Sequence, residues 1–172
     1  MPDLNPVLTK EEIEKAVAQL AQQISNDYQN RELVVVGVLK GAFIFLADLI
    51  RHLSIPVKVD FVRLASYGGR TETSGSICLT KELEIDVSGL DVLVVEDIID
   101  TGLSLEFLLE HLRSMEPKSL RLCTLIDKQE RRNRQLSIDY VGCVVGQGFL
   151  VGYGLDYAEQ YRHLPAIYNL KV

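Results

Sequence analysis

Three carboxylates stand within five residues of one another, at Glu96, Asp97 and Asp100. Like charges this close destabilise one another unless a cation, ligand hydroxyl groups or hydrogen-bond donors compensate them. A turn that only connects two elements would not require that cost. Ribose hydroxyl groups are one suitable partner because they can donate hydrogen bonds to carboxylates, so we expect a bound ligand at this point.

The residues that follow the acids indicate a phosphate. Thr101, Gly102 and Ser104 stand where an apolar helix is predicted to begin, and free backbone amides and the helix dipole favour an anion there. Two hydroxyl groups add donors, whereas Leu103 can offer only its backbone amide. Acids beside a phosphate site together describe a site for ribose 5-phosphate. The alternative is structural, because Asp100 or Thr101 could simply cap the helix.

The chain around this segment alternates between predicted strands and helices. Residues 33–39 form an apolar run too short for a helix, which is typical of a strand buried on both faces. A capping box at Thr9 and Glu12 predicts a helix that ends near Asn26. Similar patterns predict helices at 41–53 and 103–115, and strands at 57–65, 76–83, 91–96, 120–126 and 139–145.

This alternation predicts an α/β fold, with a mostly parallel, twisted sheet flanked by helices on both faces. Ligands bind such sheets at the carboxyl ends of the strands. Chemistry is therefore expected just after Leu39, Val95, Ile126 and Val145.

Composition disfavours several classes of protein. The chain has 172 residues, a length that suits one domain, and its net charge of -6 disfavours a broad nucleic-acid surface. No apolar stretch approaches the roughly 20 residues of a membrane span, and the first residues lack the pattern of a secretory signal. We therefore expect a soluble, cytoplasmic protein with no membrane partner. Cys78, Cys123 and Cys143 show no paired spacing and are expected to be free thiols.

Residues 92–105 closely resemble the phosphoribosyl pyrophosphate (PRPP) signature of the type I phosphoribosyltransferase family, and Glu-Asp-Ile-Ile-Asp-Thr-Gly is the form of its hypoxanthine-guanine branch. The resemblance implies that Glu96 and Asp97 hold the ribose 2- and 3-hydroxyl groups. It also implies that Asp100 faces purine N7 as general base or acid. The residues implied to hold the 5-phosphate are Asp100, Thr101, Gly102, Leu103 and Ser104.

Two upstream segments extend the resemblance in the family's order. Lys40 and Gly41 follow the strand at 33–39 without the full nucleotide P-loop pattern, and in the family this position is a tight turn, often with a strained peptide, that contacts pyrophosphate. By itself it could equally be an exposed lysine before a helix. Ser66 and Tyr67 open a glycine-rich stretch that could be an ordinary surface loop. The family closes a loop beginning Ser-Tyr over the reacting centre, where a lid would keep water from the ribosyl group.

The purine side of the resemblance lies in the last third of the chain. The family analogue of Lys128 hydrogen-bonds the purine 6-oxo group, and adenine is disfavoured because its amino group cannot accept from a lysine. Phe149 is implied to stack on the base, with the Leu150 backbone and Asp156 also in the purine site. Arg162 resembles the family's arginine near pyrophosphate, a role that suits a guanidinium. Taken alone, Phe149 could be a core aromatic and Arg162 half of a surface ion pair.

The resemblance further implies Mg²⁺ carried by the pyrophosphate group. The oxygen ligands expected from the protein are Asp156, Glu96 and Asp97. The ion would neutralise the leaving group.

One departure from the family stands before Phe149. The family often has a Pro-Asp-x-Phe run, whereas this chain has Gly146-Gln147-Gly148. Two glycines make the approach to the base more flexible and leave the purine preference open. Residues 130–134 are rich in arginine and are interpreted as a solvated loop, not a nucleic-acid site.

The resemblance implies transfer of a 5-phosphoribosyl group from PRPP to N9 of hypoxanthine or guanine, giving IMP or GMP. It also implies one domain over residues 1–172, a small purine hood built from the N-terminal segment and about 149–172, and a homo-dimer or homo-tetramer. Two alternatives remain at this point. One is an RNA-binding regulator of transcription with the same fold, which the acidic charge disfavours. The other is a nucleotide-binding module without turnover.

Overall fold

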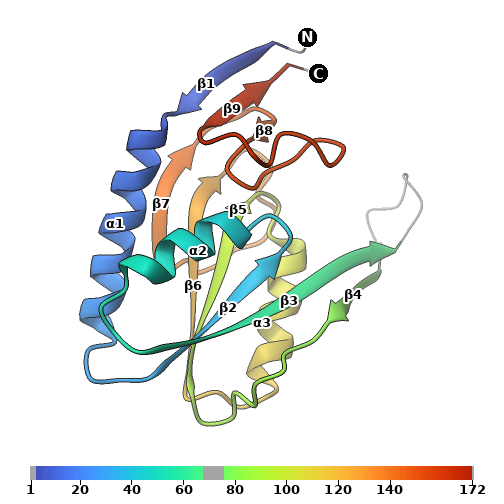
Figure 1. Ribbon diagram of the computed structural model, residues 1–172. Coiled ribbons are helices and arrows are strands. Elements are labelled where there is room, and N and C mark those ends of the chain that lie inside the picture. The colour runs from blue at the N-terminus through green and yellow to red at the C-terminus, as the bar shows by residue number, and fades with distance from the viewer. Residues whose placement is uncertain (1–2, 68–75, 172) are drawn as a thin grey trace.

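The computed structural model describes residues 3–67 and 76–171, and its centre is a six-stranded sheet (Figure 1). The strand order is β4-β3-β2-β5-β6-β7. All neighbouring pairs are parallel except β3 and β4, which are antiparallel. The strands are β2 (Leu33–Leu39), β3 (Val57–Tyr67), β4 (Ser76–Lys81), β5 (Asp91–Ile99), β6 (Ser119–Lys128) and β7 (Tyr140–Val145).

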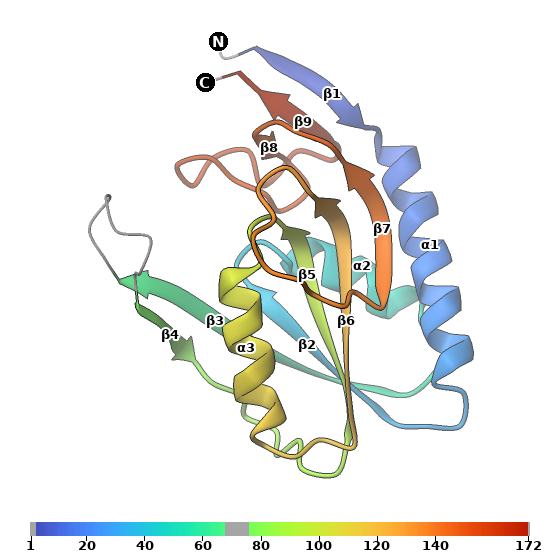
Figure 2. The ribbon, with the colours of Figure 1, turned by 180° about the vertical axis from the view of Figure 1, so that it is seen from behind.

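Helices cover both faces of this sheet, as the two opposite views show (Figures 1 and 2). α1 (Lys10–Asp27) and α2 (Phe43–His52) lie on one face, and α3 (Leu103–Arg113) lies on the other. Alternate residues of β2 point into the two cores: Val35 packs with α1 and α2, and Val36 packs with α3. The uninterrupted apolar run at 33–39 is required because both faces of the strand are buried.

The start of α1 confirms the predicted capping box. The Thr9 backbone N–H donates to Glu12 Oε2 at 2.8 Å, and the Glu12 backbone N–H donates to Thr9 Oγ1 at 3.1 Å. The two residues thereby satisfy amide groups that the first helical turn leaves without partners. The helix ends at Asp27, one residue beyond the predicted end.

A second, three-stranded sheet lies beyond the carboxyl ends of β5, β6 and β7 (Figure 1). It consists of β1 (Leu4–Leu8), β9 (Ile167–Leu170) and β8 (Leu150–Val151), paired antiparallel in that order. These strands are not predicted from the sequence. They have two to five residues each, too few for a clear alternation.

The predicted fold class is confirmed: the protein is α/β, with a mostly parallel sheet between helices. The boundaries differ most where the site lies. The strand predicted at 91–96 continues to Ile99, and the helix predicted at 41–53 begins only at Phe43. Ser66 and Tyr67 end β3, and residues 68–75 of the predicted lid lie outside the described residues. Over residues 3–67 and 76–171, no helix is long and apolar enough to span a membrane.

Candidate active site

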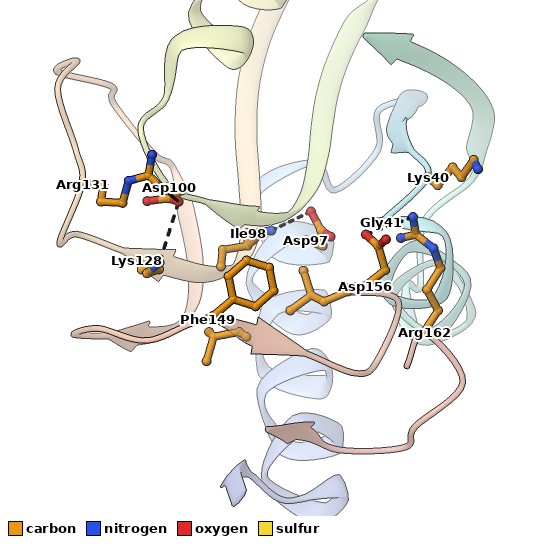
Figure 3. Close-up of a pocket in the computed structure, with 12 residues that line it drawn as sticks. Lys40, Gly41, Asp97, Ile98, Asp100, Lys128, Arg131, Phe149, Asp156 and Arg162 are labelled. Atoms are coloured by element: carbon orange, nitrogen blue, oxygen red, sulfur yellow. Dashed lines mark hydrogen bonds and ion pairs between the residues drawn. The ribbon is translucent and has the colours of Figure 1, made fainter. Parts of the chain in front are cut away.

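Residues from the turn after β2, from β5 and β6, and from the C-terminal segment meet in one cavity of about 370 Å³, at the carboxyl ends of the strands. Most of the sequence-predicted site residues line it (Figure 3). On one side lie Asp100 and Lys128, and on the other lie Asp97, Asp156 and Arg162. The full lining is Lys40, Gly41, Asp97, Ile98, Asp100, Lys128, Arg131, Phe149, Leu150, Leu155, Asp156 and Arg162.

A smaller pocket of about 130 Å³ lies at the start of α3 and contains most of the predicted phosphate-binding residues. Gly102 caps the start of the helix, directly before Leu103, and has φ +85°, a left-handed conformation that glycine adopts without steric cost. The Leu103 backbone N–H contacts Thr101 Oγ1 at 3.4 Å. The lining residues are Glu96, Ile98, Ile99, Asp100, Thr101, Gly102, Ser104 and Leu105. Ile98 and Asp100 also line the larger cavity, so the two spaces are adjacent.

The predicted ribose pair is divided between the two spaces, with Glu96 lining the smaller pocket and Asp97 the larger cavity. Burial raises the pKa of Glu96 well above its usual value, and the neighbouring Asp97 charge adds to this effect. Burial also raises the pKa of Asp97, although hydrogen bonds from its surroundings oppose the change. The ligand-free pair is therefore reluctant to carry two negative charges, as the spacing of these residues predicted.

Asp97 is held against the turn that follows β2. Its Oδ1 accepts a hydrogen bond from the Ile98 backbone N–H at 2.8 Å. A Cβ placed on Gly41 would lie 1.9 Å from Asp97 Oδ2, so only glycine fits at this position. A Cβ on Gly154 would in turn lie 2.3 Å from the Gly41 carbonyl oxygen. The Leu39–Lys40 peptide at the start of this turn is cis. Three chain segments therefore meet here without room for a side chain.

Asp100 lies between two cations. Its Oδ2 is 3.7 Å from Lys128 Nζ and 3.6 Å from an Nη1 of Arg131. Lys128 is buried, and its Nζ also lies 3.8 Å from Glu130 Oε2. The other Asp100 oxygen, Oδ1, is buried and accepts no hydrogen bond within the part of the chain that the structure describes. This oxygen can therefore accept a hydrogen bond from a further donor.

The residues predicted to bind pyrophosphate are paired with acids. Lys40 Nζ contacts Glu159 Oε2 at 3.1 Å. Arg162 contacts Asp156 Oδ1 at 3.1 Å and Glu159 Oε1 at 3.3 Å, and its Nη1 donates to the Gly154 carbonyl oxygen at 2.7 Å. Lys40 lowers the pKa of Glu159 through a hydrogen bond and its charge. Glu159 thus contacts both cations that the sequence analysis assigned to an anion.

Phe149 offers an accessible aromatic face at the cavity. The residue is 45% exposed, so the interpretation as a core aromatic is wrong. The Tyr157 ring packs edge-on against it, with centroids 5.5 Å apart. The Phe149 backbone N–H donates to Asn169 Oδ1 at 3.0 Å, which ties it to β9. Leu150, next in the chain, is buried in β8.

Sequence reasoning missed several residues of this site. Arg131 lines the cavity, although residues 130–134 were interpreted as a solvated loop. That interpretation is wrong for Arg132, whose side chain is only 18% exposed. Glu159 was also missed, because its contact with Lys40 joins positions 119 residues apart. The one available signal was the position of the basic run, directly after the strand that ends in Lys128.

Comparisons with known proteins identify the family of the chain. The model of the phosphoribosyl transferase domain family matches residues 5–158. The hypoxanthine-guanine phosphoribosyltransferase of Bacillus subtilis is 45% identical over 170 residues, which are 98% of this chain and 94% of that protein. The hypoxanthine phosphoribosyltransferase of Salmonella typhimurium is 44% identical, covering 94% and 92%. A crystal structure of a Bacillus anthracis hypoxanthine-guanine phosphoribosyltransferase superposes with a TM-score of 0.93, at 46% identity over 97% of this chain and 98% of that one.

Proposed function

The chain belongs to the phosphoribosyltransferase family, and we propose that it transfers the 5-phosphoribosyl group from PRPP to N9 of hypoxanthine or guanine. The products are IMP or GMP and pyrophosphate, and the reaction is a purine salvage step. The observation that carries this proposal is the adjacency of two spaces that share Ile98 and Asp100. The pocket at the start of α3 has the backbone conformation of a phosphate site. The larger cavity has the aromatic face of Phe149 and the buried Lys128.

On the donor side, the 5-phosphate binds in the pocket at the start of α3. The Ser104 amide and the Thr101 and Ser104 hydroxyl groups supply donors from residues that line the pocket. The amide of Leu103, the first residue of the helix, adds another donor, and the helix dipole favours the anion. Glu96 and Asp97 accept hydrogen bonds from the ribose hydroxyl groups. Those donors stabilise the charged carboxylates, whose pKa values burial raises in the free protein, and at Glu96 they also offset the charge of Asp97.

On the acceptor side, the purine stacks on Phe149, and its 6-oxo group accepts a hydrogen bond from Lys128. Asp100 receives the N7 proton as the N9–C1 bond forms and the bond from C1 to pyrophosphate breaks. The buried Asp100 Oδ1, which has no hydrogen-bond donor among the described residues, supports this role. An unpaired acceptor at this depth is stabilised when a substrate N–H reaches it.

Lys40, Gly41 and Arg162 bind the departing pyrophosphate, and Asp97 and Asp156 line the same side of the cavity. When bound, Mg²⁺ would neutralise part of the leaving-group charge. Within the described residues there is no group of three or more acidic, histidine or cysteine side chains placed to hold a metal. Two carboxylates suit an ion for which substrate and water supply most of the ligands, as is common for Mg²⁺. Glu96, the third predicted ligand, lines the other pocket.

The small sheet of β1, β9 and β8 is the natural purine hood, because Leu150 of β8 and the preceding Phe149 line the cavity. Residues 1–172 then act as one domain with the hood as a part. The family resemblance favours a homo-dimer or homo-tetramer, which sedimentation equilibrium would distinguish. A cytoplasmic location is also proposed, because PRPP carries several charges and does not cross membranes unaided.

The proposal is tested by steady-state kinetics with PRPP and Mg²⁺ and each of hypoxanthine, guanine, xanthine and adenine. Hypoxanthine and guanine should be converted, and adenine should not, because its amino group cannot accept a hydrogen bond from Lys128. Turnover of adenine equal to that of hypoxanthine would contradict the role of Lys128. No nucleotide from any of the four bases would contradict the function itself.

A further inference from the structure

Arg132 joins the carboxyl ends of β5 and β6. Its Nε donates to the Asp100 carbonyl oxygen at 2.9 Å, and its Nη2 donates to the Ile99 carbonyl oxygen at 3.2 Å. The same Nη2 contacts the Asp127 carboxylate and, at 3.4 Å, the Lys128 carbonyl oxygen. One largely buried side chain therefore contacts the backbone of both residues proposed to act on the purine.

The strand pairing explains why such a contact matters. The β5–β6 register ends with Ile99 opposite Asp127, so Asp100 lies one residue beyond the last pair. Backbone beyond the end of a ladder is not held by its hydrogen bonds. The bond from Arg132 Nε supplies a fixed partner for the carbonyl of Asp100 at this point.

The residues after Arg132 hold the neighbouring turn. The Asn133 backbone N–H donates to the Thr101 carbonyl oxygen at 3.3 Å. The Leu136 side chain packs against Gly102, where an added Cβ would lie 2.8 Å from Leu136 Cδ1. The polar contacts of the Arg132 side chain are with residues 99, 100, 127 and 128, whereas Asn133 and Leu136 contact the turn at Thr101 and Gly102. Only the aliphatic part of Arg132 reaches this turn, with its Cδ 3.6 Å from a Cβ placed on Gly102. Variants that keep an aliphatic chain at position 132 therefore remove the polar contacts with the strand ends and retain packing against the turn.

We propose that Arg132 is a positioning residue for phosphoribosyl transfer, which sets the placement of Asp100 relative to Lys128. Its catalytic consequence rests on the proposed function. The side chain does not line either cavity, so it acts through the two residues that do. A planar guanidinium suits this task because its fixed fork of donors bonds several acceptors at once.

A purely structural role would arise if Arg132 served only to offset the buried charge of Asp127. Two variants separate these roles. Arg132→Lys keeps a cation beside Asp127 but not the planar fork. The double variant Arg132→Met with Asp127→Asn removes the need for a counter-charge and also the bonds to both strand ends. Arg134→Met is the matched control, because Arg134 belongs to the same loop, is half exposed and pairs with Glu106.

The variants are compared by steady-state kinetics, by thermal unfolding and by amide hydrogen exchange of the ligand-free proteins. We expect both Arg132 variants to fold and to lose about tenfold to hundredfold in kcat, since a displacement of about 1 Å in a reacting group has such an effect. KM for PRPP should change by less than about threefold, because ground-state contacts to the donor remain. Exchange at the amides of residues 99–101 should be about tenfold faster. Arg134→Met should match the parent protein.

Several results would overturn the proposal. A folded variant with kcat and exchange within about twofold of the parent would show that Arg132 positions nothing. Equal losses in Arg134→Met would assign the effect to the loop as a whole, and loss of folding in both Arg132 variants would assign Arg132 to stability alone. The exchange measurement does not depend on turnover. An inactive parent protein would therefore refute the proposed function, whereas unchanged exchange would refute the positioning role.

Discussion

The closest approach in the site makes Gly41→Ala its most informative substitution. The new Cβ would lie 1.9 Å from Asp97 Oδ2 and 2.8 Å from its Cγ. Real Cβ atoms do not approach other atoms below 3.0 Å, so the carboxylate or the turn after β2 must move by about 1 Å. The carboxylate is also bonded to the Ile98 backbone N–H, and the turn lies against Gly154, so neither moves freely.

A displacement of that size at a group proposed to orient the reacting sugar is expected to cost about a hundredfold in rate. We therefore expect Gly41→Ala to lower kcat/KM for PRPP by about that factor, with a far smaller effect on folding. The assay is the spectrophotometric formation of IMP with PRPP varied at saturating hypoxanthine. Thermal unfolding measured in parallel reports the effect on stability.

Gly146→Ala is the matched control, because a Cβ there would meet no atom within 4 Å. It should keep kcat/KM within about twofold of the parent. Equal losses in the two variants would mean that any glycine substitution near the cavity is harmful. A Gly41→Ala protein within about threefold of the parent would refute the steric argument, since a contact of 1.9 Å would then have been relieved without displacing Asp97.

Three further predictions concern single carboxylates. Asp100→Asn should lower kcat by about a hundredfold to ten-thousandfold and leave the calorimetric Kd for PRPP nearly unchanged, and equal losses would refute the proton role. Burial raises the folded-state pKa of Glu96 above its usual 4.5, so the ligand-free protein should lose stability as pH rises from about 4.5. In thermal unfolding, Glu96→Gln should flatten this dependence of stability on pH. A parallel pH profile for parent and variant would argue against a raised pKa. At Asp60, burial opposes ionisation, but hydrogen bonds from the Phe61, Glu84 and Ile85 amides outweigh this effect and lower the pKa. Asp60→Asn should therefore lower the free energy of unfolding by about 1–3 kcal/mol, measured in urea at neutral pH. That difference should shrink as pH falls below 3.8, because the stabilisation is lost when the folded carboxylate is protonated.

How far the sequence predicts this structure depends on whether a signal is local. The run at 33–39 matches β2 to the residue, because a strand between two layers must be apolar throughout. Thr9 and Glu12 specify the start of α1 through their own bonds. β8 has only two residues, and its place depends on pairing with β9, which no local pattern encodes.

The site residues divide in the same way. Residues 96–104 are contiguous, and their acids and hydroxyl groups indicate a sugar phosphate without reference to the rest of the chain. Arg132 and Glu159 look like ordinary surface charges in the sequence, because what makes them part of the site is the distance to other segments. Arg132 reaches the Asp100 carbonyl oxygen across 32 positions, and Glu159 reaches Lys40 across 119. Only the folded sheet brings these groups together.

The position of Asp100 connects the two halves of the proposed reaction. It lines both the pocket at the start of α3 and the larger cavity, whereas Glu96 lines only the first and Lys128 only the second. A general base at the junction can remove the purine proton only if the base and the sugar phosphate are both in place, because each occupies a different space. Single-turnover measurements should therefore show that substitutions in the phosphate pocket, such as Ser104→Ala, reduce the rate of transfer and not only PRPP affinity. An unchanged transfer rate at saturating PRPP would mean that the two spaces act independently.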